Sequence, residues 1–272
     1  MGLVEAIILG LVQGFTEFLP ISSTAHLRIV PSLLGWQDPG AAFTATIQLG
    51  TLLAVLIYFR ADLGRLLGGM ARRQPLESKI GWGIAIGTIP VVVLGLAGKN
   101  AIEGSLRSLH VIAFSLISMG LVLLAAEKMG KKTRTFEELT TKDGVIIGLW
   151  QAIALIPGAS RSGSTISGAL FCGLDRPTAA RFSFLLSVPS IFAAGVYEAY
   201  KSRHDLFGAG LTPTLVATVV AFVSGYASIA FLVSFLQKSS TVAFVIYRCV
   251  LGALILGLLM AGTLDPMAGI VK

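Results

Sequence analysis

The sequence predicts an all-α polytopic membrane protein in which six full transmembrane helices and two re-entrant helical hairpins form an inverted-topology repeat. Of the 272 residues, 54% are hydrophobic and 13% are charged, whereas soluble domains carry about 25% charged residues. Six apolar runs are long enough to cross a bilayer, and two further apolar regions are interrupted by polar, turn-forming residues. This composition excludes a soluble globular enzyme, a disordered chain and a disulfide-rich secreted domain.

Each of the six apolar runs has the length of about 20 residues that a helix needs to cross the hydrocarbon core. The runs lie at about 40–59, 80–99, 108–127, 181–200, 211–235 and 243–263. We expect a transmembrane helix in each. Because no long polar linker separates them, residues 1–272 are expected to form a single integral membrane domain.

The two interrupted regions, 1–36 and 143–174, are expected to form the hairpins. The first is broken from Phe18 to Thr24 and the second from Pro157 to Thr165. The apolar pieces around the second break have roughly 13 and 10 residues, too few to cross at about 1.5 Å per residue. A hairpin that enters and leaves on one side fits both regions. The less favoured alternative makes each region a true span, which gives eight spans.

The two interrupted regions also resemble each other, which predicts an internal repeat. Gly10-Leu11-Val12-Gln13 matches Gly148-Leu149-Trp150-Gln151, and the prolines of the two breaks align when one residue is deleted. Each half of the chain, about 1–127 and about 143–263, then holds one hairpin and three spans. Because three is odd, the second half must be inserted upside down, which places the expected site near the midplane.

Positive charge predicts the orientation of the chain. Ten of the 21 Lys and Arg residues lie in two connecting segments, 60–79 and 128–142. Cationic segments between apolar spans mark the cytoplasmic side. The N-terminus and the first hairpin are then expected outside, and the second hairpin enters from the cytoplasm. Much of the net charge of +7 thus serves to orient the chain in the membrane, and nucleic acid is not an expected partner.

The first break carries the parts of an activated nucleophile. Gln13 and Glu17 lie four residues apart on one helix face, and Ser22-Ser23-Thr24 is a natural N-cap for the next half-helix. His26 follows Ser23 by one helical turn, where an imidazole can reach the hydroxyl. A hydroxyl, a base and a nearby carboxylate together favour catalysis. The alternative is plain capping, with Glu17 facing water.

The second break carries the parts of an anion site. Arg161 lies between two apolar half-segments, where a cation needs an anionic partner. Gly158 and Gly163 allow close backbone approach, and free N–H groups at a half-helix N-terminus bind anions. The planar fork of arginine suits phosphate, so we favour a phosphate site over a plain loop. Hydroxyl donors are expected from Ser160, Ser162, Ser164 and Thr165.

If the repeat brings the two breaks together, they hold the equipment for phosphoryl transfer. A substrate that reaches membrane depth should be a lipid, which predicts a lipid phosphate or diphosphate phosphatase. The main alternative is a secondary transporter or flippase, which also uses inverted repeats but needs no nucleophile. A third is an intramembrane serine protease using Ser23 and His26, for which Arg161 is poorly suited. Arg248 lies nearer a predicted helix end, from which it could snorkel to the interface.

At these residues the sequence resembles the undecaprenyl-diphosphate phosphatase family associated with bacitracin resistance, over essentially the whole chain. The segment from Gln13 to Glu17 fits the family's Glu-or-Gln-x-x-x-Glu motif. The segment from Pro20 to His26 fits Pro-x-Ser-Ser-Thr-x-His, and that from Pro157 to Thr165 fits Pro-Gly-x-Ser-Arg-Ser-x-x-Thr.

The resemblance implies hydrolysis of undecaprenyl diphosphate to undecaprenyl phosphate and inorganic phosphate, which recycles the lipid carrier of cell-wall synthesis and gives bacitracin resistance. It implies the bacterial plasma (inner) membrane, an active site that faces the periplasm, and a divalent cation, Mg²⁺ or Ca²⁺. Gln13 stands where many members have Glu, so Glu17 and the diphosphate itself are the expected metal ligands. The expected partners are the polyprenyl diphosphate lipid and, in a homodimer, a second copy of the chain.

The expected mechanism begins with attack of Ser23 on the terminal phosphorus, with His26 accepting the proton. Glu17 orients His26 or holds the metal, and Arg161 stabilises the developing charge. A version with His26 as the nucleophile, through a phosphohistidine, stays open. The expected catalytic residues are Glu17, Ser23, His26 and Arg161. The expected substrate-binding residues are Gln13, Ser22, Ser160, Ser162, Gly163, Ser164 and Thr165.

Overall fold

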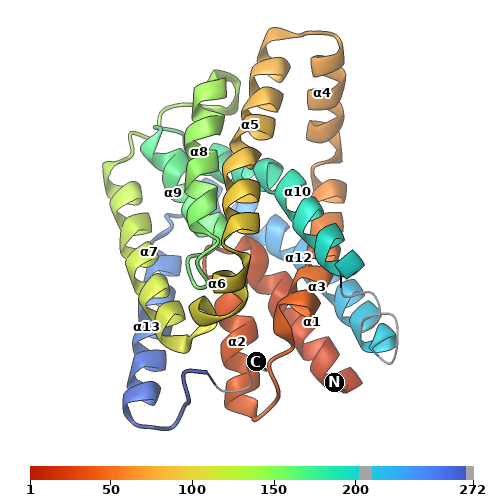
Figure 1. Ribbon diagram of the computed structural model, residues 1–272. Coiled ribbons are helices and arrows are strands. Elements are labelled where there is room, and N and C mark those ends of the chain that lie inside the picture. The colour runs from red at the N-terminus through yellow and green to blue at the C-terminus, as the bar shows by residue number, and fades with distance from the viewer. Residues whose placement is uncertain (202–209, 268–272) are drawn as a thin grey trace.

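The computed structural model describes residues 1–201 and 210–267, and its regular elements are helices. Figure 1 shows them packed as one bundle. In chain order they are α1 (Leu3–Phe18), α2 (Ser23–Leu34), α3 (Gly40–Tyr58), α4 (Arg60–Ala71), α5 (Pro75–Ala97), α6 (Lys99–Glu103), η1 (Ser105–Arg107), α7 (Leu109–Met129), η2 (Phe136–Glu138), α8 (Thr141–Ile153), α9 (Arg161–Phe171), α10 (Arg176–Lys201), α12 (Leu211–Lys238) and α13 (Val242–Met260).

Each of the six expected spans is a helix: α3, α5, α7, α10, α12 and α13. Within the described residues, five of these are long and apolar enough to cross a membrane alone. The sixth, α3, passes the same test together with α4, from which it is bent by 74°. We expected residues 60–79 to form only a connecting segment. Instead most of them belong to helices: α4 covers Arg60–Ala71, and α5 begins at Pro75.

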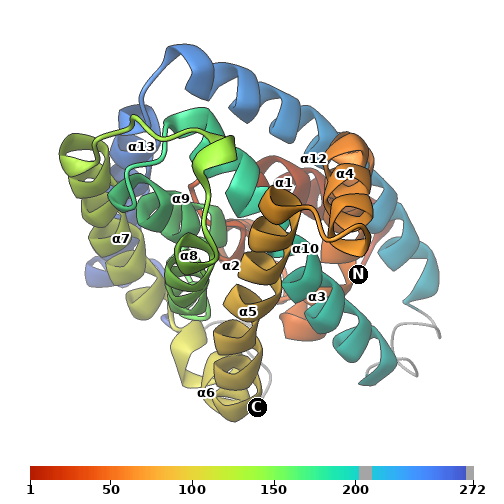
Figure 2. The ribbon, with the colours of Figure 1, turned by 90° about the horizontal axis from the view of Figure 1, so that it is seen from above.

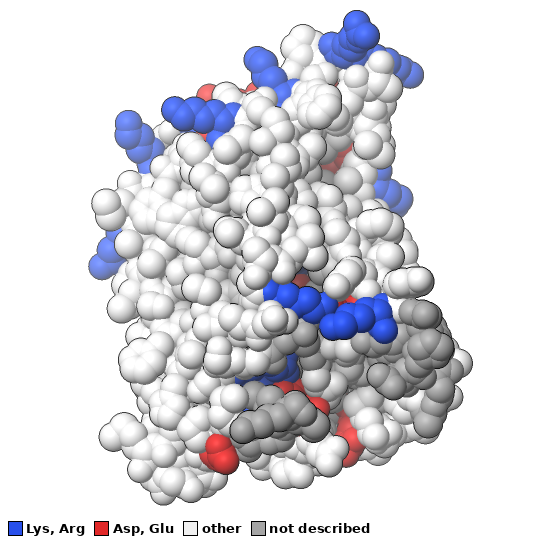
Figure 3. All heavy atoms as spheres, viewed as in Figure 1, with Lys and Arg blue, Asp and Glu red and all other residues white. Residues whose placement is uncertain are grey.

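The outer faces of the bundle are apolar. Trp82, Ile89 and Val93 on α5 and Val219 and Val223 on α12 are exposed, although water would favour polar side chains on an exposed helix face. Lys and Arg side chains gather instead at the end that carries the α4–α5 turn and the α7–α8 connection (Figure 3). The surface therefore has the pattern of a membrane protein with one strongly cationic end.

Both interrupted regions form helical hairpins whose tips lie inside the bundle. Helices α1 and α2 enter from the end that carries the N-terminus, and α8 and α9 enter from the opposite, cationic end (Figure 1). Viewed from above, the hairpins occupy the centre, with α7 and α13 on one side and α3 and α12 on the other (Figure 2). An inverted repeat requires this opposition of the hairpins; the repeat itself stays a prediction.

In each break, the residue just before the next helix is a serine with a positive φ, 74° at Ser22 before α2 and 71° at Ser160 before α9. Such a φ is unfavourable for a residue with a side chain, and both serines offset it by capping the next helix. The Ser22 hydroxyl accepts a hydrogen bond from the Ala25 N–H, and the Ser160 hydroxyl accepts one from the Gly163 N–H. The chain can therefore turn sharply into α2 and α9 at membrane depth.

The second hairpin is anchored at the cationic end. Thr140 and Asp143 form a capping box that starts α8. Arg134 donates to both carboxylate oxygens of Asp143, at 2.9 and 2.7 Å, and to the carbonyl of Cys172 just after α9. Burial alone would raise the pKa of Asp143, but hydrogen bonds from Arg134 and Thr140 outweigh it and lower that pKa. The anchor therefore persists into mildly acidic solution.

Glycines let the outer arm of each hairpin approach a span closely. A Cβ atom on Gly148 of α8 would lie 2.2 Å from the carbonyl oxygen of Gly87 on α5. A Cβ atom on Gly14 of α1 would lie 1.9 Å from the hydroxyl of Ser224 on α12. Small residues four apart on one helix face allow such close packing in membranes. The depth of each break in the bundle thus depends on these contacts.

We predict that Gly148→Ala destabilises the protein, because the added methyl group must push α8 away from α5. The expected loss is about 1–3 kcal/mol, measured as a lower unfolding midpoint in detergent. Gly68→Ala on the exposed face of α4 is the matched control, since a Cβ atom there meets open space. It should leave stability unchanged or raise it by about 1 kcal/mol. Equal stability of Gly148→Ala and wild type would contradict the packing.

Candidate active site

The two breaks are joined by one buried arginine. Arg248 of α13 is fully buried, with 0% of its surface exposed. Its guanidinium donates to the carbonyls of Leu116, Pro20, Ser115, Gly158 and Ala159 at 2.9–3.2 Å. Arg248 does not snorkel, although its place near a helix end allowed it, because the carbonyls of both breaks hold its charge inside the bundle.

Three further hydrogen bonds cross directly between the breaks. The Ser162 hydroxyl donates to the Leu19 carbonyl at 3.0 Å, and the Gly158 N–H donates to the Thr24 hydroxyl at 3.3 Å. Arg161 Nη2 donates to Glu17 Oε1 at 2.8 Å. The structure therefore brings the breaks together, as the sequence analysis required, and gives Arg161 a carboxylate partner from the other hairpin.

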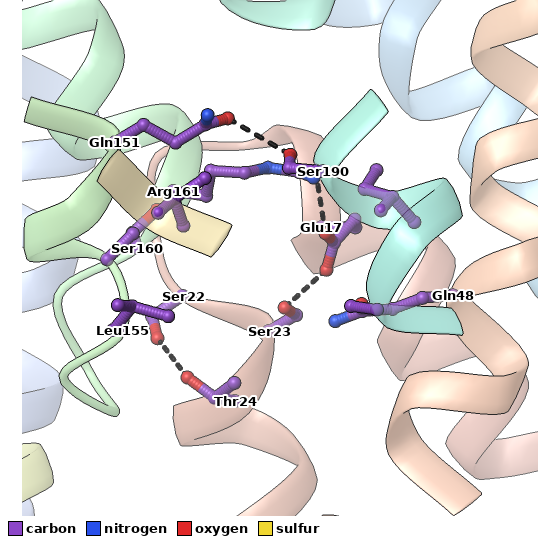
Figure 4. A pocket seen from close by; sticks show the side chains of 14 residues that line it. Glu17, Ser22, Ser23, Thr24, Gln48, Gln151, Leu155, Ser160, Arg161 and Ser190 are labelled. Atoms are coloured by element: carbon purple, nitrogen blue, oxygen red, sulfur yellow. Dashed lines mark hydrogen bonds and ion pairs between the residues drawn. The ribbon is translucent and has the colours of Figure 1, made fainter. Parts of the chain in front are cut away.

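Glu17 is the centre of this arrangement (Figure 4). Its Oε2 accepts a hydrogen bond from Ser23 Oγ at 2.5 Å and another from Gln13 Nε2 at 3.0 Å. Its Oε1 accepts the hydrogen bond from Arg161. Gln13 and Glu17 share one face of α1, as their spacing predicts, and both are buried. The carboxylate thus connects the serine of one break to the arginine of the other.

His26 lies elsewhere than expected. We predicted a contact between its imidazole and the Ser23 hydroxyl. Instead Nδ1 lies 2.7 Å from the Ser22 carbonyl and Nε2 lies 2.6 Å from the Tyr247 hydroxyl. The imidazole also stacks on the Tyr247 ring at 5.6 Å. Both ring nitrogens are therefore engaged away from Ser23, whose hydroxyl bonds to Glu17 instead.

A cavity of about 180 Å³ opens beside Glu17, Ser23 and Arg161. Of the residues expected to bind substrate, Ser22 and Ser160 line it, whereas the other expected second-break residues do not. Gly163 N–H caps onto Ser160. Thr165 bonds to the Arg161 carbonyl and, at 2.5 Å, to the hydroxyl of Ser183, and Ser164 is fully buried. Fewer residues of the second break therefore face the cavity than we expected. The reason is geometric: α9 begins at Arg161, and successive side chains of a helix point to different faces.

Outside the two breaks, the polar residues that line the cavity were missed: Gln48 on α3, Gln151 on α8 and Ser190 on α10. Ser190 donates to the amide oxygen of Gln151 at 3.2 Å (Figure 4). The internal repeat held a signal for Gln151, since it aligns with Gln13, and a polar residue in an apolar run is costly. For Gln48 and Ser190 the only signal was that each is a polar residue in an apolar run.

Comparisons with known proteins show the family of this chain. Residues 6–254 match the family model of the bacitracin resistance protein BacA. The chain belongs to the BacA family. It is 54% identical to an undecaprenyl-diphosphatase of Myxococcus xanthus, over 99% of this chain and 93% of the relative. It is 55% identical to that of Prosthecochloris aestuarii, over 97% and 100%, and 52% identical to that of Chlorobaculum tepidum, over 98% and 100%.

We predict that Arg248→Gln disrupts the site of this BacA-family chain, because the carbonyls of both breaks lose their shared donor. The expected cost is about 3–5 kcal/mol, read as a lower unfolding midpoint in detergent. Arg60→Gln is the control: Arg60 is exposed and, among the described residues, donates to the nearby Ile57 carbonyl at 3.1 Å. That change should stay within about 0.5 kcal/mol of wild type. If the two variants unfolded at the same temperature, Arg248 would not join the breaks.

Proposed function

We propose that this chain is an undecaprenyl-diphosphatase. It hydrolyses undecaprenyl diphosphate to undecaprenyl phosphate and inorganic phosphate, which recycles the lipid carrier of bacterial cell-wall synthesis and gives bacitracin resistance. One observation carries the proposal: Ser23 donates to the Glu17 carboxylate at 2.5 Å, and Arg161 holds the other oxygen of that carboxylate at 2.8 Å. Membership of the BacA family and the names of the relatives support it.

Glu17 acts as the base in the proposed mechanism, because it is the acceptor of the Ser23 proton. Ser23 Oγ forms a bond to the terminal phosphorus as its proton moves to Glu17. The bond from phosphorus to the bridging oxygen breaks, and undecaprenyl phosphate leaves with the proton that Glu17 passes to it. Water then attacks the phosphoserine and gives a proton to the regenerated Glu17 carboxylate. The bond from phosphorus to Ser23 Oγ breaks, Glu17 returns that proton to the oxygen, and inorganic phosphate is released. The reaction splits one difficult displacement into two.

Arg161 stabilises the charge that develops on the phosphoryl oxygens. It is the first residue of α9, so its guanidinium and the positive end of that helix lie on the same side of the cavity. Substrate phosphate replaces Glu17 as the partner of Arg161. This exchange frees one carboxylate oxygen and makes Glu17 a stronger base, since a neighbouring cation lowers basicity.

His26 is a positioning residue in this mechanism. Its ring bonds to the carbonyl of Ser22 and to Tyr247, so it fixes the turn that presents Ser23. A phosphohistidine stays the alternative and requires the ring to leave both partners. Transport without cleavage is the competing function. It gives no role to the contact between Ser23 and Glu17, because binding a headgroup needs no activated hydroxyl.

We also propose that the catalytic cavity is reached from the periplasmic side of the inner membrane. The positive-inside rule supports this orientation: Lys and Arg side chains gather at the end from which α8 and α9 enter (Figure 3). The opposite end, which carries the N-terminus, then faces the periplasm. The homodimer stays a prediction, which light scattering of the protein–detergent complex would measure.

A divalent cation is a further part of the proposal. Among the described residues there is no group of three His, Cys, Asp or Glu side chains that could hold a metal ion. Glu17 is the acidic ligand available in the cavity, and Mg²⁺ or Ca²⁺ favours several oxygen ligands. The protein side chains therefore do not complete a site by themselves, and most of the ligands would come from the diphosphate.

We predict that Ser23→Ala reduces phosphate release from a polyprenyl diphosphate in detergent by about 10³-fold or more. Ser118→Ala, on the exposed face of α7, is the control and should keep wild-type turnover. A phospho-enzyme trapped with labelled substrate should map to Ser23. Label on His26, or near-normal turnover of Ser23→Ala, would refute the serine mechanism. Substrate binding without any phosphate release by the wild type would favour transport.

We predict that Gln13→Glu lowers the Mg²⁺ concentration for half-maximal activity by about tenfold, because a second carboxylate joins Glu17. Gln13 Nε2 lies 3.0 Å from Glu17 Oε2, which places the new carboxylate within reach of the same ion. Gln74→Glu, an exposed change at the start of α5, adds the same charge elsewhere and should leave the Mg²⁺ dependence unchanged. An unchanged or higher Mg²⁺ requirement in Gln13→Glu would contradict a cation beside Glu17.

A further inference from the structure

A second cavity of about 250 Å³ adjoins the catalytic one. Thr24, Gln48, Ala154 and Leu155 line both cavities. Thr24 and Arg28 of α2 both line the second cavity, and α2 runs from the centre of the bundle toward the end that carries the N-terminus (Figure 1). Arg28 on α2 and Arg107 of η1 also line it. Two cations therefore lie on the route between the catalytic cavity and the proposed periplasmic side.

Arg28 has donors to spare. Only 2% of its surface is exposed. Nη1 donates to the Ser32 hydroxyl at 3.1 Å, whereas Nε and Nη2 have no hydrogen-bond partner among the described residues. Buried guanidinium groups normally have their donors satisfied. Arg28 itself lines the cavity, so a ligand with oxygen acceptors is the simplest partner for its two free donors.

The carboxylates nearby do not satisfy Arg28. Asp38 is 3.6 Å from Arg28 Nε, and both of its oxygens accept from Arg107 Nη2 at 2.7 Å. Asp38 also accepts from the Gly40 N–H. Asp265 acts on Arg28 only from a distance, through its charge. Asp38 is thus already hydrogen-bonded to Arg107, so Arg28 can bind a second anion.

We propose that Arg28 and Arg107 form a second, outer phosphate-binding site in this cavity. The guanidinium fork of Arg28 offers two donors to a tetrahedral oxyanion, and low solvent exposure strengthens the attraction. The source of the phosphate rests on the proposed function: it is either the inorganic phosphate that leaves the catalytic cavity or the headgroup of the arriving lipid. The binding of phosphate itself does not depend on hydrolysis.

Binding of inorganic phosphate tests the site without catalysis. The full-length Glu17→Gln/Arg161→Gln protein in detergent lacks the catalytic charges, and calorimetry should still detect phosphate binding. Adding Arg28→Gln should weaken binding about tenfold or more, since it removes the free donors. Adding Asp38→Asn should tighten binding several-fold, because it removes the competing anion. Arg65→Gln, which breaks an ion pair with Glu77 on the α4–α5 unit, is the charge-matched control and should change nothing.

The outcomes separate the site from a structural ion pair. No binding by the Glu17→Gln/Arg161→Gln protein, or equal affinity with and without Arg28→Gln, would overturn the proposal. A purely structural pair also predicts that Asp38→Asn does not tighten binding. If Arg28→Gln fails to give monodisperse protein, Arg107→Gln replaces it. That change frees Asp38 to pair with Arg28 and should weaken phosphate binding as well.

Kinetics of the active protein identify the source. Conversion of a labelled short-chain polyprenyl diphosphate is measured with and without added inorganic phosphate. If Arg28→Gln raises the inhibition constant for phosphate about tenfold and leaves KM unchanged, the site binds the released phosphate. A tenfold rise in KM at unchanged inhibition constant assigns it to the lipid headgroup. A change in neither overturns the site, whereas an inactive wild type refutes the proposed function and leaves the calorimetric result standing.

Discussion

The hydrogen bonds of Arg248 to the two breaks are the constraint on which the rest of the structure depends. A guanidinium with no exposed surface is costly, and broken helices at membrane depth leave carbonyl groups that water cannot reach. Each problem resolves the other, because Arg248 donates to Pro20 in the first break and to Gly158 and Ala159 in the second. The breaks must therefore face each other, and this proximity creates the catalytic cavity.

The ion pair between Glu17 and Arg161 turns that proximity into chemistry. Neither charge is tolerable alone in an apolar bundle, and each comes from a different hairpin, so the resting site is neutral and preassembled. In the proposed mechanism, a phosphate group competes with Glu17 for Arg161, and binding of the anion releases the carboxylate that faces Ser23. Substrate recognition and activation of the serine are then one exchange of partners.

The hairpins and the need for an anion beside Arg161 could be predicted because their causes are local or general, whereas Glu17 was not predicted to be that anion. The turn-forming residues at Pro20 and Pro157 interrupt apolar runs, and an intramembrane arginine requires an anion. The orientation of His26 could not be predicted, because Tyr247, which is 221 residues away, decides it. Ser183 engages Thr165 in the same long-range way. Spacing along one helix limits which atoms can meet, whereas packing between helices selects among them.

A double-mutant cycle on Glu17 and Arg161 tests the central claim most directly. The kcat/KM of wild type, Glu17→Gln, Arg161→Gln and the double variant gives the coupling between the two hairpins. If one exchange of partners drives the reaction, the double variant loses far less than the product of the single losses, with a coupling of at least about 1.4 kcal/mol. Losses that multiply, to within about 0.5 kcal/mol, would mean that the two breaks act independently and would contradict the account.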